Sequence, residues 1–317
     1  VGDDWSDFQV SDRLPILAVA GLILSMAYSA GRLSLAAVRT DRGLTGLETF
    51  VFSMAVGLSE WSLLTLATGL AGGLHGPWLS AAACSAVAGW AVWKWSQRRA
   101  TGIEKDDAPS RPDQRWEAHS TQREAGLDDG WLARHGLWLA LPFLLLIVAG
   151  AMLPPWDFDV REYHLQVPKE WHQAGRIGFL PHNVYGNMPL GAELHALLAM
   201  VFMPGPRDWW WGALAGKTVI ACFAPLAALG LLAAGRRFDS PQAGLVAALV
   251  YLSLPWVVHV SQAGLAEGAV ACYLVLAVYA MGIWAGEDAA LASRAGSRSA
   301  PRGPLLLAGF LAGSAAA

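Results

Sequence analysis

Long apolar stretches, separated by polar connections, constrain the fold of this chain more than any other feature. A transmembrane helix needs about 20 apolar residues, each rising about 1.5 Å along the axis. Seven stretches reach this length and an eighth begins near residue 303; the seven lie near residues 14–36, 46–72, 77–95, 134–154, 209–235, 241–260 and 263–285. The pattern predicts an all-α polytopic membrane protein with about eight transmembrane helices, the last of them truncated.

The composition agrees with this class of protein. Hydrophobic residues make up 55% of the chain and charged residues 15%, whereas soluble domains carry about 25% charged residues. Trp, a residue type that favours the membrane–water interface, occurs 16 times. A net charge of −3 gives no indication of a nucleic-acid partner. Three cysteines lie inside apolar runs, which indicates core residues rather than a disulfide framework or a metal site: Cys84, Cys222 and Cys272.

The distribution of Lys and Arg predicts an orientation, because these residues accumulate on the cytoplasmic side of a membrane. Basic residues cluster in four connections, at Arg39 and Arg42, at 94–99, at Arg236 and Arg237, and at 294–302. If all four clusters are cytoplasmic, the N-terminus and the loop at 155–208 lie outside. We expect three regions: a three-helix N-terminal membrane region at 1–95, a hydrophilic cytoplasmic linker at 96–133 and a membrane core at 134–317. The chain begins with Val1 and stops inside an apolar run, so we expect a fragment of a longer protein.

One apolar segment inside the loop is too short to cross a membrane. Residues 190–203 are helix-like, but 14 residues extend only about 21 Å along a helix axis. We expect this helix either to lie along the outer interface or to be re-entrant.

The loop between the fourth and fifth apolar stretches is rich in groups that can do chemistry. Three carboxylates lie within six residues, at Asp157, Asp159 and Glu162, and Tyr163 and His164 follow. Carboxylates beside a membrane can act as a general base or as metal ligands. An ordinary solvated loop is the alternative interpretation.

Cationic and amide groups follow in the same loop. Residues 160–174 are expected to form an interfacial helix despite Pro168, and its cations, with Arg161 and Lys169 foremost, can hold a phosphate leaving group. Anchoring to the membrane surface is the alternative role. The segment that follows carries side chains suited to sugar hydroxyls and sugar faces, although the same residues are common in turns: His182, Asn183, Tyr185 and Asn187.

Four ionisable residues fall inside or beside the apolar stretches. Glu267 opens the seventh stretch and is a candidate second acid of the loop site, with pairing to Lys217 or simple exposure as alternatives. Lys217 needs a counter-charge, which a lipid phosphate or a carboxylate could supply. Glu48 is expected to be exposed at the inner end of the second stretch. Glu60 lies near mid-membrane, where a pair with Arg32 is conceivable.

The order of these pieces resembles a known family. Asp159 is followed four residues later by Tyr-His-Leu, then by Pro168-Lys169, by Gly-Arg-Ile at 175–177 and by Asn-Met-Pro at 187–189. MPLGAEL at 188–194 and AGLAEGAV at 263–270 complete the series. Over roughly residues 135–317 the chain resembles the GT-C class of membrane glycosyltransferases, and most closely the family 39-type relatives of protein O-mannosyltransferases and lipid A aminoarabinose transferases.

The resemblance implies an inverting transferase of the bacterial inner membrane that uses a polyprenyl-phosphate sugar at the extracytoplasmic face. Asp159 takes the position of the family's catalytic acid, with Asp157 and Glu162 as rivals, and the lipid phosphate would be held by Lys169, Arg161 or Lys217. No cofactor is required, although a divalent metal is compatible with the chemistry. The acceptor would be a hydroxyl of a lipid, glycan or protein. Two other classes remain open: a transporter or flippase of a lipid-linked sugar, and a non-catalytic membrane protein whose loop binds a partner.

Overall fold

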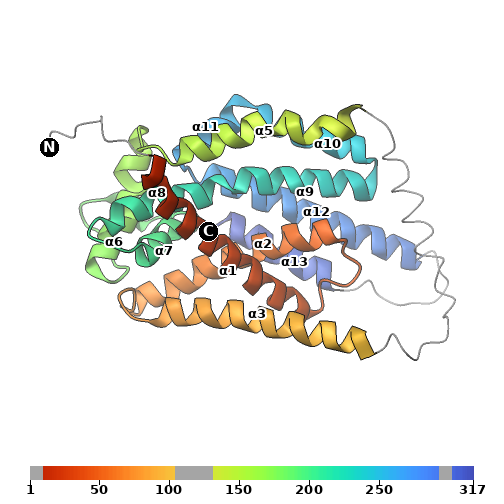
Figure 1. Ribbon diagram of the computed structural model, residues 1–317, viewed down its shortest axis with the longest axis horizontal. Helices are drawn as coiled ribbons and strands as arrows, with labels where there is room; N and C mark the ends of the chain where they lie inside the picture. The colour runs from red at the N-terminus through yellow and green to blue at the C-terminus, as the bar shows by residue number, and fades with distance from the viewer. Residues whose placement is uncertain (1–9, 104–130, 293–301) are drawn as a thin grey trace.

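The computed structural model describes residues 10–103, 131–292 and 302–317. All regular elements in these ranges are helices. Most of the long helices lie side by side along the longest axis of the molecule (Figure 1), and the short helices of the 155–208 loop gather at one end of this bundle, at the left of the picture. This end is called the loop end below, and the other is called the opposite end.

The helices follow in chain order, with two short 3₁₀ segments and one π-helical segment denoted η. Their bounds are η2 Val10–Arg13, α1 Leu14–Val38, α2 Gly46–Leu70, α3 Trp78–Ile103, α5 Trp131–Ala151, η4 Val160–His164, α6 Gln166–Ala174, η5 Val184–Asn187, α7 Leu194–Phe202, α8 Asp208–Ala221, α9 Phe223–Phe238, α10 Pro241–Ser253, α11 Pro255–Ala263, α12 Glu267–Ala292 and α13 Gly303–Ala315. The expected linker at 96–133 lies mostly outside the described residues, as do the acidic N-terminus and the basic residues at 294–301.

Four segments of the described chain are long and apolar enough to cross a membrane: Ser11–Val38, Gly46–Leu70, Asp208–Phe238 and Glu267–Gly286. They coincide with four of the expected spans. A fifth is added if α10 and α11 count as one broken span. Within the described residues α5 and α13 are shorter apolar helices, and α3 is not among the qualifying segments. A polytopic helical membrane protein is therefore supported, whereas the expected total of eight spans is not confirmed.

The expected span at 241–260 is bent instead of straight. Helices α10 and α11 meet at an angle of 61°, and the backbone of Leu254 between them is extended, with φ −66° and ψ 122°. The residue before a proline is driven out of the helical region by the proline ring, and Pro255 also lacks the N–H that a continuous helix requires. Pro255 instead begins α11, the position in a helix that proline tolerates best.

The apolar segment at 190–203 is short, as expected, but it is not laid on a surface. Helix α7 covers only Leu194–Phe202, and its first seven residues are buried. It packs against the beginning of α8, where glycines permit close contact: a Cβ on Gly212 would collide with the backbone of Met200, and one on Gly216 with Ala196. Its position relative to the membrane, along the outer interface or re-entrant, stays a prediction.

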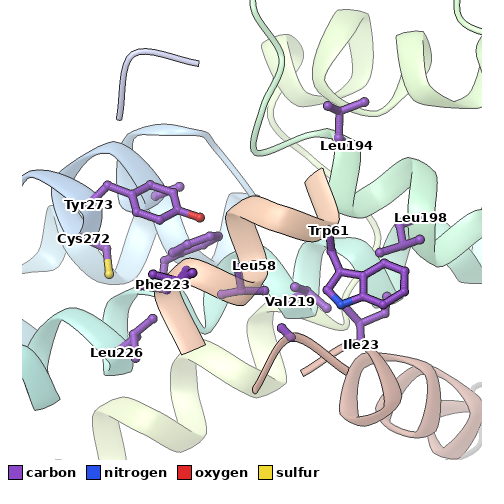
Figure 2. Packing of buried hydrophobic residues seen from close by; sticks show 14 of the residues in the cluster. Ile23, Leu58, Trp61, Leu194, Leu198, Val219, Phe223, Leu226, Cys272 and Tyr273 are labelled. Atoms are coloured by element: carbon purple, nitrogen blue, oxygen red, sulfur yellow. The ribbon is translucent and has the colours of Figure 1, made fainter. Parts of the chain in front are cut away.

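The main hydrophobic core forms where α1, α2, α7, α8, α9 and α12 meet. Figure 2 shows Leu58 and Trp61 of α2 between Leu198 of α7 on one side and Phe223 and Tyr273 on the other. Burial of these apolar side chains fixes α7 against α2 and includes Tyr273 of α12 in the same core. The residues that connect these helices at the loop end are thereby held in place.

A buried polar network joins α2, α9 and α12 at the opposite end. Arg237 donates to both carboxylate oxygens of Glu48, at 2.9 and 3.0 Å, and the hydroxyl of Tyr279 donates to the same carboxylate. Glu48 is 1% exposed, so the expectation that it is exposed was wrong. Arg32 faces Asp41 at 3.6 Å, and no ion pair joins it to Glu60 within the described residues, so the conceivable Arg32–Glu60 pair is not present.

Candidate functional site

The loop site begins with a helix start that Asp157 builds. Helix α5 ends at Ala151, and the chain then passes Pro154 and Pro155, which cannot continue it. The Oδ1 atom of Asp157 accepts hydrogen bonds from the backbone N–H groups of Asp159, at 3.0 Å, and of Val160, at 3.4 Å. This is the arrangement of a helix N-cap, so one oxygen of the Asp157 carboxylate is occupied by the backbone.

The next turn is π-helical, which places its side chains differently from an α-helix. The N–H of Leu165 donates to the carbonyl of Val160 at 3.0 Å, an interval of five residues. Such turns are rare in proteins, and where they occur they are often found at functional sites. Val160 and His164 point inward and are buried, whereas Arg161 and Glu162 are exposed. The helix expected over 160–174 is present as two segments, η4 and α6, with Pro168 in the first turn of α6; its interfacial position stays a prediction.

His164 is fixed by a carboxylate from a distant part of the loop. Its Nδ1 atom shares a hydrogen bond with Oε1 of Glu193, and both side chains are buried, at 8% and 3% exposure. Glu193 is the residue that precedes α7. The pair therefore ties the π-helical turn to the helix that packs in the core. Removing one partner of a buried pair of this kind costs stability, because the other polar group is left buried without a hydrogen bond.

Tyr163 is the point at which acids from separate segments converge. Its ring stacks on Tyr185 with centroids 4.9 Å apart and lies 4.2 Å from the ring of His164. The pKa of Tyr163 is raised above its ordinary value, first by burial and then by the negative charges of Asp159, Glu267 and Glu193. Removing the phenolic proton would place a further negative charge beside these carboxylates. Three acids far apart in the sequence thus act on one ring.

The three acids of the motif differ in what their carboxylates do. Asp157 caps the helix start through Oδ1. Glu162 is exposed, and it contributes its backbone carbonyl, which accepts from Nδ2 of Asn183 at 3.0 Å. Asp159 is also exposed, but its carboxylate accepts no hydrogen bond from the described residues and acts on Tyr163. Among the three, Asp159 is the carboxylate that combines freedom to react with a position at the convergence.

The cations of the prediction have different environments. Lys169 lies over the ring of Trp209, with Nζ 4.2 Å from the centroid, and Arg161 is exposed on η4. Lys217 is 1% exposed, and its Nζ atom donates to the carbonyl of Leu153 at 3.0 Å. No carboxylate of the described residues pairs with Lys217, so the alternative of a Glu267–Lys217 pair is not supported. Its side chain packs against Gly264, in the turn before α12.

Several of the polar loop residues hold the backbone together. Asn187 donates to the carbonyl of Asn183 at 3.2 Å, and His182 pairs with Glu170 at 2.8 Å. His172 contacts Asp208 through Nε2, at 3.0 Å. These contacts favour turn chemistry for Asn183 and Asn187 over direct contact with a sugar. Tyr185, half exposed and stacked on Tyr163, remains available for such contact.

The sequence prediction did not include Glu193 among the site residues. Its signal was present in MPLGAEL at 188–194, because an acid there interrupts an otherwise apolar segment that is buried on folding. A buried carboxylate needs a partner, and the histidine in the preceding loop was a candidate. No group of three or more His, Cys, Asp or Glu side chains in the described ranges is arranged to hold a metal ion.

Comparison with protein-family models, with curated proteins and with solved structures finds no match for this chain.

Proposed function

We propose that this chain forms part of a membrane glycosyltransferase that moves a sugar from a polyprenyl-phosphate donor to an acceptor hydroxyl at the extracytoplasmic face. The observation that carries the proposal is the arrangement around Tyr163. Its ring contacts His164 and Tyr185, Glu193 binds His164, and the charges of Asp159 and Glu267 help to raise the Tyr163 pKa.

In the proposed reaction Asp159 is the general base. Its carboxylate takes the proton of the acceptor hydroxyl while the hydroxyl oxygen forms a bond to the anomeric carbon of the donor sugar. The bond between that carbon and the phosphate oxygen breaks, and the lipid phosphate leaves with the electron pair, so the configuration at the anomeric carbon inverts. General-base catalysis of this kind contributes on the order of 10²–10⁴ in rate.

The departing phosphate needs cations, and two exposed or partly exposed ones stand on the same segment as the base. Arg161 is two residues from Asp159, and Lys169 lies on α6 over Trp209. Arg in particular can hold phosphate oxygens in a bidentate manner. Lys217 is assigned a structural role here, since its ammonium is buried and bound to the carbonyl that precedes Pro154.

The test is a transfer assay with full-length protein in liposomes that contain a panel of polyprenyl-phosphate sugars. Asp159→Asn should lower transfer on the order of 10²-fold or more. Asp157→Asn is the matched control: asparagine caps a helix as well as aspartate does, so this variant should keep transfer within a few-fold of wild type. Equal loss in both variants, or none in Asp159→Asn, would contradict the assignment of the base.

A second function, transport of a lipid-linked sugar, is favoured by one feature. Transporters place substrate sites at broken helices, and α10 and α11 form such a break, with an angle of 61°. The same liposomes discriminate the two functions: a wild-type protein that yields no transfer from any donor but moves the labelled lipid between leaflets would be a transporter.

A further inference from the structure

A cavity lies between α2, the turn before α7 and the first turns of α12. Its volume is about 290 Å³, at the lower end of the usual range for small-molecule sites, about 300–1,000 Å³. Ser59 and Ser62 of α2, Glu193, and Tyr273 of α12 contribute polar groups to walls that are otherwise made of small apolar residues and the end of α13. The cavity is thus large enough for one small ring.

Two buried polar atoms of the wall have no partner among the described residues. Tyr273 is 5% exposed and its hydroxyl makes no hydrogen bond there; Figure 2 shows this hydroxyl directed away from α12 toward α2. Glu193 is 2% exposed, and only its Oε1 atom is bonded, to His164, which leaves Oε2 free. Neither atom is among the fully enclosed unsatisfied groups, so both keep access to the cavity. Buried polar groups are normally satisfied, which indicates that a ligand completes them.

The chemistry of the wall defines the ligand. Tyr273 can donate a hydrogen bond and the Glu193 carboxylate can accept one, while the serine oxygens retain lone pairs. No Lys, Arg or His is among the described residues that line the cavity. A phosphate would therefore find no positive charge there, and the Glu193 carboxylate would repel it. Hydroxyl groups, which donate and accept, match this wall. The small side chains of Ala192 and Ala269, and Gly191, which has none, leave room for the faces of a ring.

We infer that this cavity binds a single neutral sugar ring, with Tyr273 and Glu193 contacting its hydroxyls. Glu193 lines the cavity and holds His164 of the loop, so this one side chain connects the cavity to the residues around Tyr163. Assigning that ring to a substrate of the transfer reaction rests on the proposed function; binding of the ring does not.

The test measures binding without turnover. Saturation-transfer NMR on full-length protein in nanodiscs would be recorded with a panel of methyl hexosides and methyl pentosides, and with inorganic phosphate as the negative probe. At least one glycoside should bind to wild type. Tyr273→Phe should weaken it about fivefold, the factor that corresponds to about 1 kcal/mol for one hydrogen bond. Val270→Trp, at the exposed rim of the cavity, should abolish it.

The matched control is Val278→Trp, which puts the same side chain on α12 at a position 72% exposed and away from the cavity; it should bind like wild type. No binding of any glycoside, or binding that is unaffected by Val270→Trp, would overturn the inference. Glycoside binding without transfer activity would leave the cavity assigned and refute only the transferase. In an active protein, a rise in the donor KM of Tyr273→Phe assigns the ring to the donor, and a rise in the acceptor KM assigns it to the acceptor.

Discussion

At the residue scale, the structure separates carboxylates that the sequence leaves equivalent. Asp157, Asp159 and Glu162 share one short segment, and composition cannot rank them. The difference arises from backbone geometry: Asp157 stands where it caps two N–H groups, and a π-helical turn directs Glu162 outward. The pairing of His164 with Glu193 was equally hidden, because it depends on how α7 folds back beneath the loop.

The convergence of acids at Tyr163 can be measured without an activity. Asp159→Asn and Glu267→Gln should each lower the Tyr163 pKa toward its ordinary value, because each removes a negative charge that opposes ionisation of the phenol. The Asp159 variant should have the larger effect, since Asp159 is the stronger of the two influences. Burial should keep the pKa raised in both variants.

The measurement is a pH titration of ¹³C-labelled tyrosine by NMR, with the Tyr163 signal assigned from Tyr163→Phe. Glu162→Gln serves as the control, because Glu162 is adjacent in sequence but does not contribute to the shift, and it should leave the titration unchanged. An unaltered Tyr163 titration in both Asp159→Asn and Glu267→Gln would show that the acids do not converge.

At the element scale, close helix packing depends on glycines whose role the sequence pattern shows only in outline. Small residues recur along the apolar stretches and permit close approach, but the pattern does not say which of them meet. In the structure a Cβ on Gly57 of α2 would collide with the backbone of Ala27, and one on Gly31 of α1 with that of Ser53. Gly21, in the same helix as Gly31, has open space around its Cα.

Gly57→Ala should therefore destabilise the protein by about 1–3 kcal/mol through overpacking of α1 against α2. Gly21→Ala should be neutral or slightly stabilising, since alanine is the better helix former and meets nothing. Thermal unfolding in detergent, followed by circular dichroism, would compare the two variants with wild type. Equal stability of Gly57→Ala and Gly21→Ala would contradict the close packing of α1 on α2.

At the scale of the whole molecule, the sequence predicted most where apolar length alone decides the structure. The stretches at 14–36, 46–72, 209–235 and 263–285 became helices of spanning length, because about 20 apolar residues have few other ways to satisfy their backbone in lipid. The stretch at 241–260 forms two helices with a bend between them instead of one straight helix, and Pro255 marks the position of this break in the sequence. The burial of α7 could not be predicted, since it depends on contacts with α2 and α8 that are remote in sequence.

The charge distribution predicts an orientation of the bundle in the membrane, and the pairing of Arg237 with Glu48 removes one cation from that argument. The bias at the opposite end therefore rests on the remaining basic residues of the four clusters, among them Arg39, Arg42, Arg236 and those at 94–99. These suffice for the positive-inside rule, and they predict that the loop end is extracytoplasmic.

In a variant without the three native cysteines, Pro206→Cys reports on the loop end and Asp239→Cys on the opposite end; both positions are exposed. A membrane-impermeant maleimide should label intact bacterial cells at residue 206 and reach residue 239 only after permeabilisation. Both variants should react in detergent, which controls for accessibility. Labelling of residue 239 but not 206 in intact cells would invert the protein and place Asp159 in the cytoplasm, where a donor displayed on the outer leaflet cannot reach it.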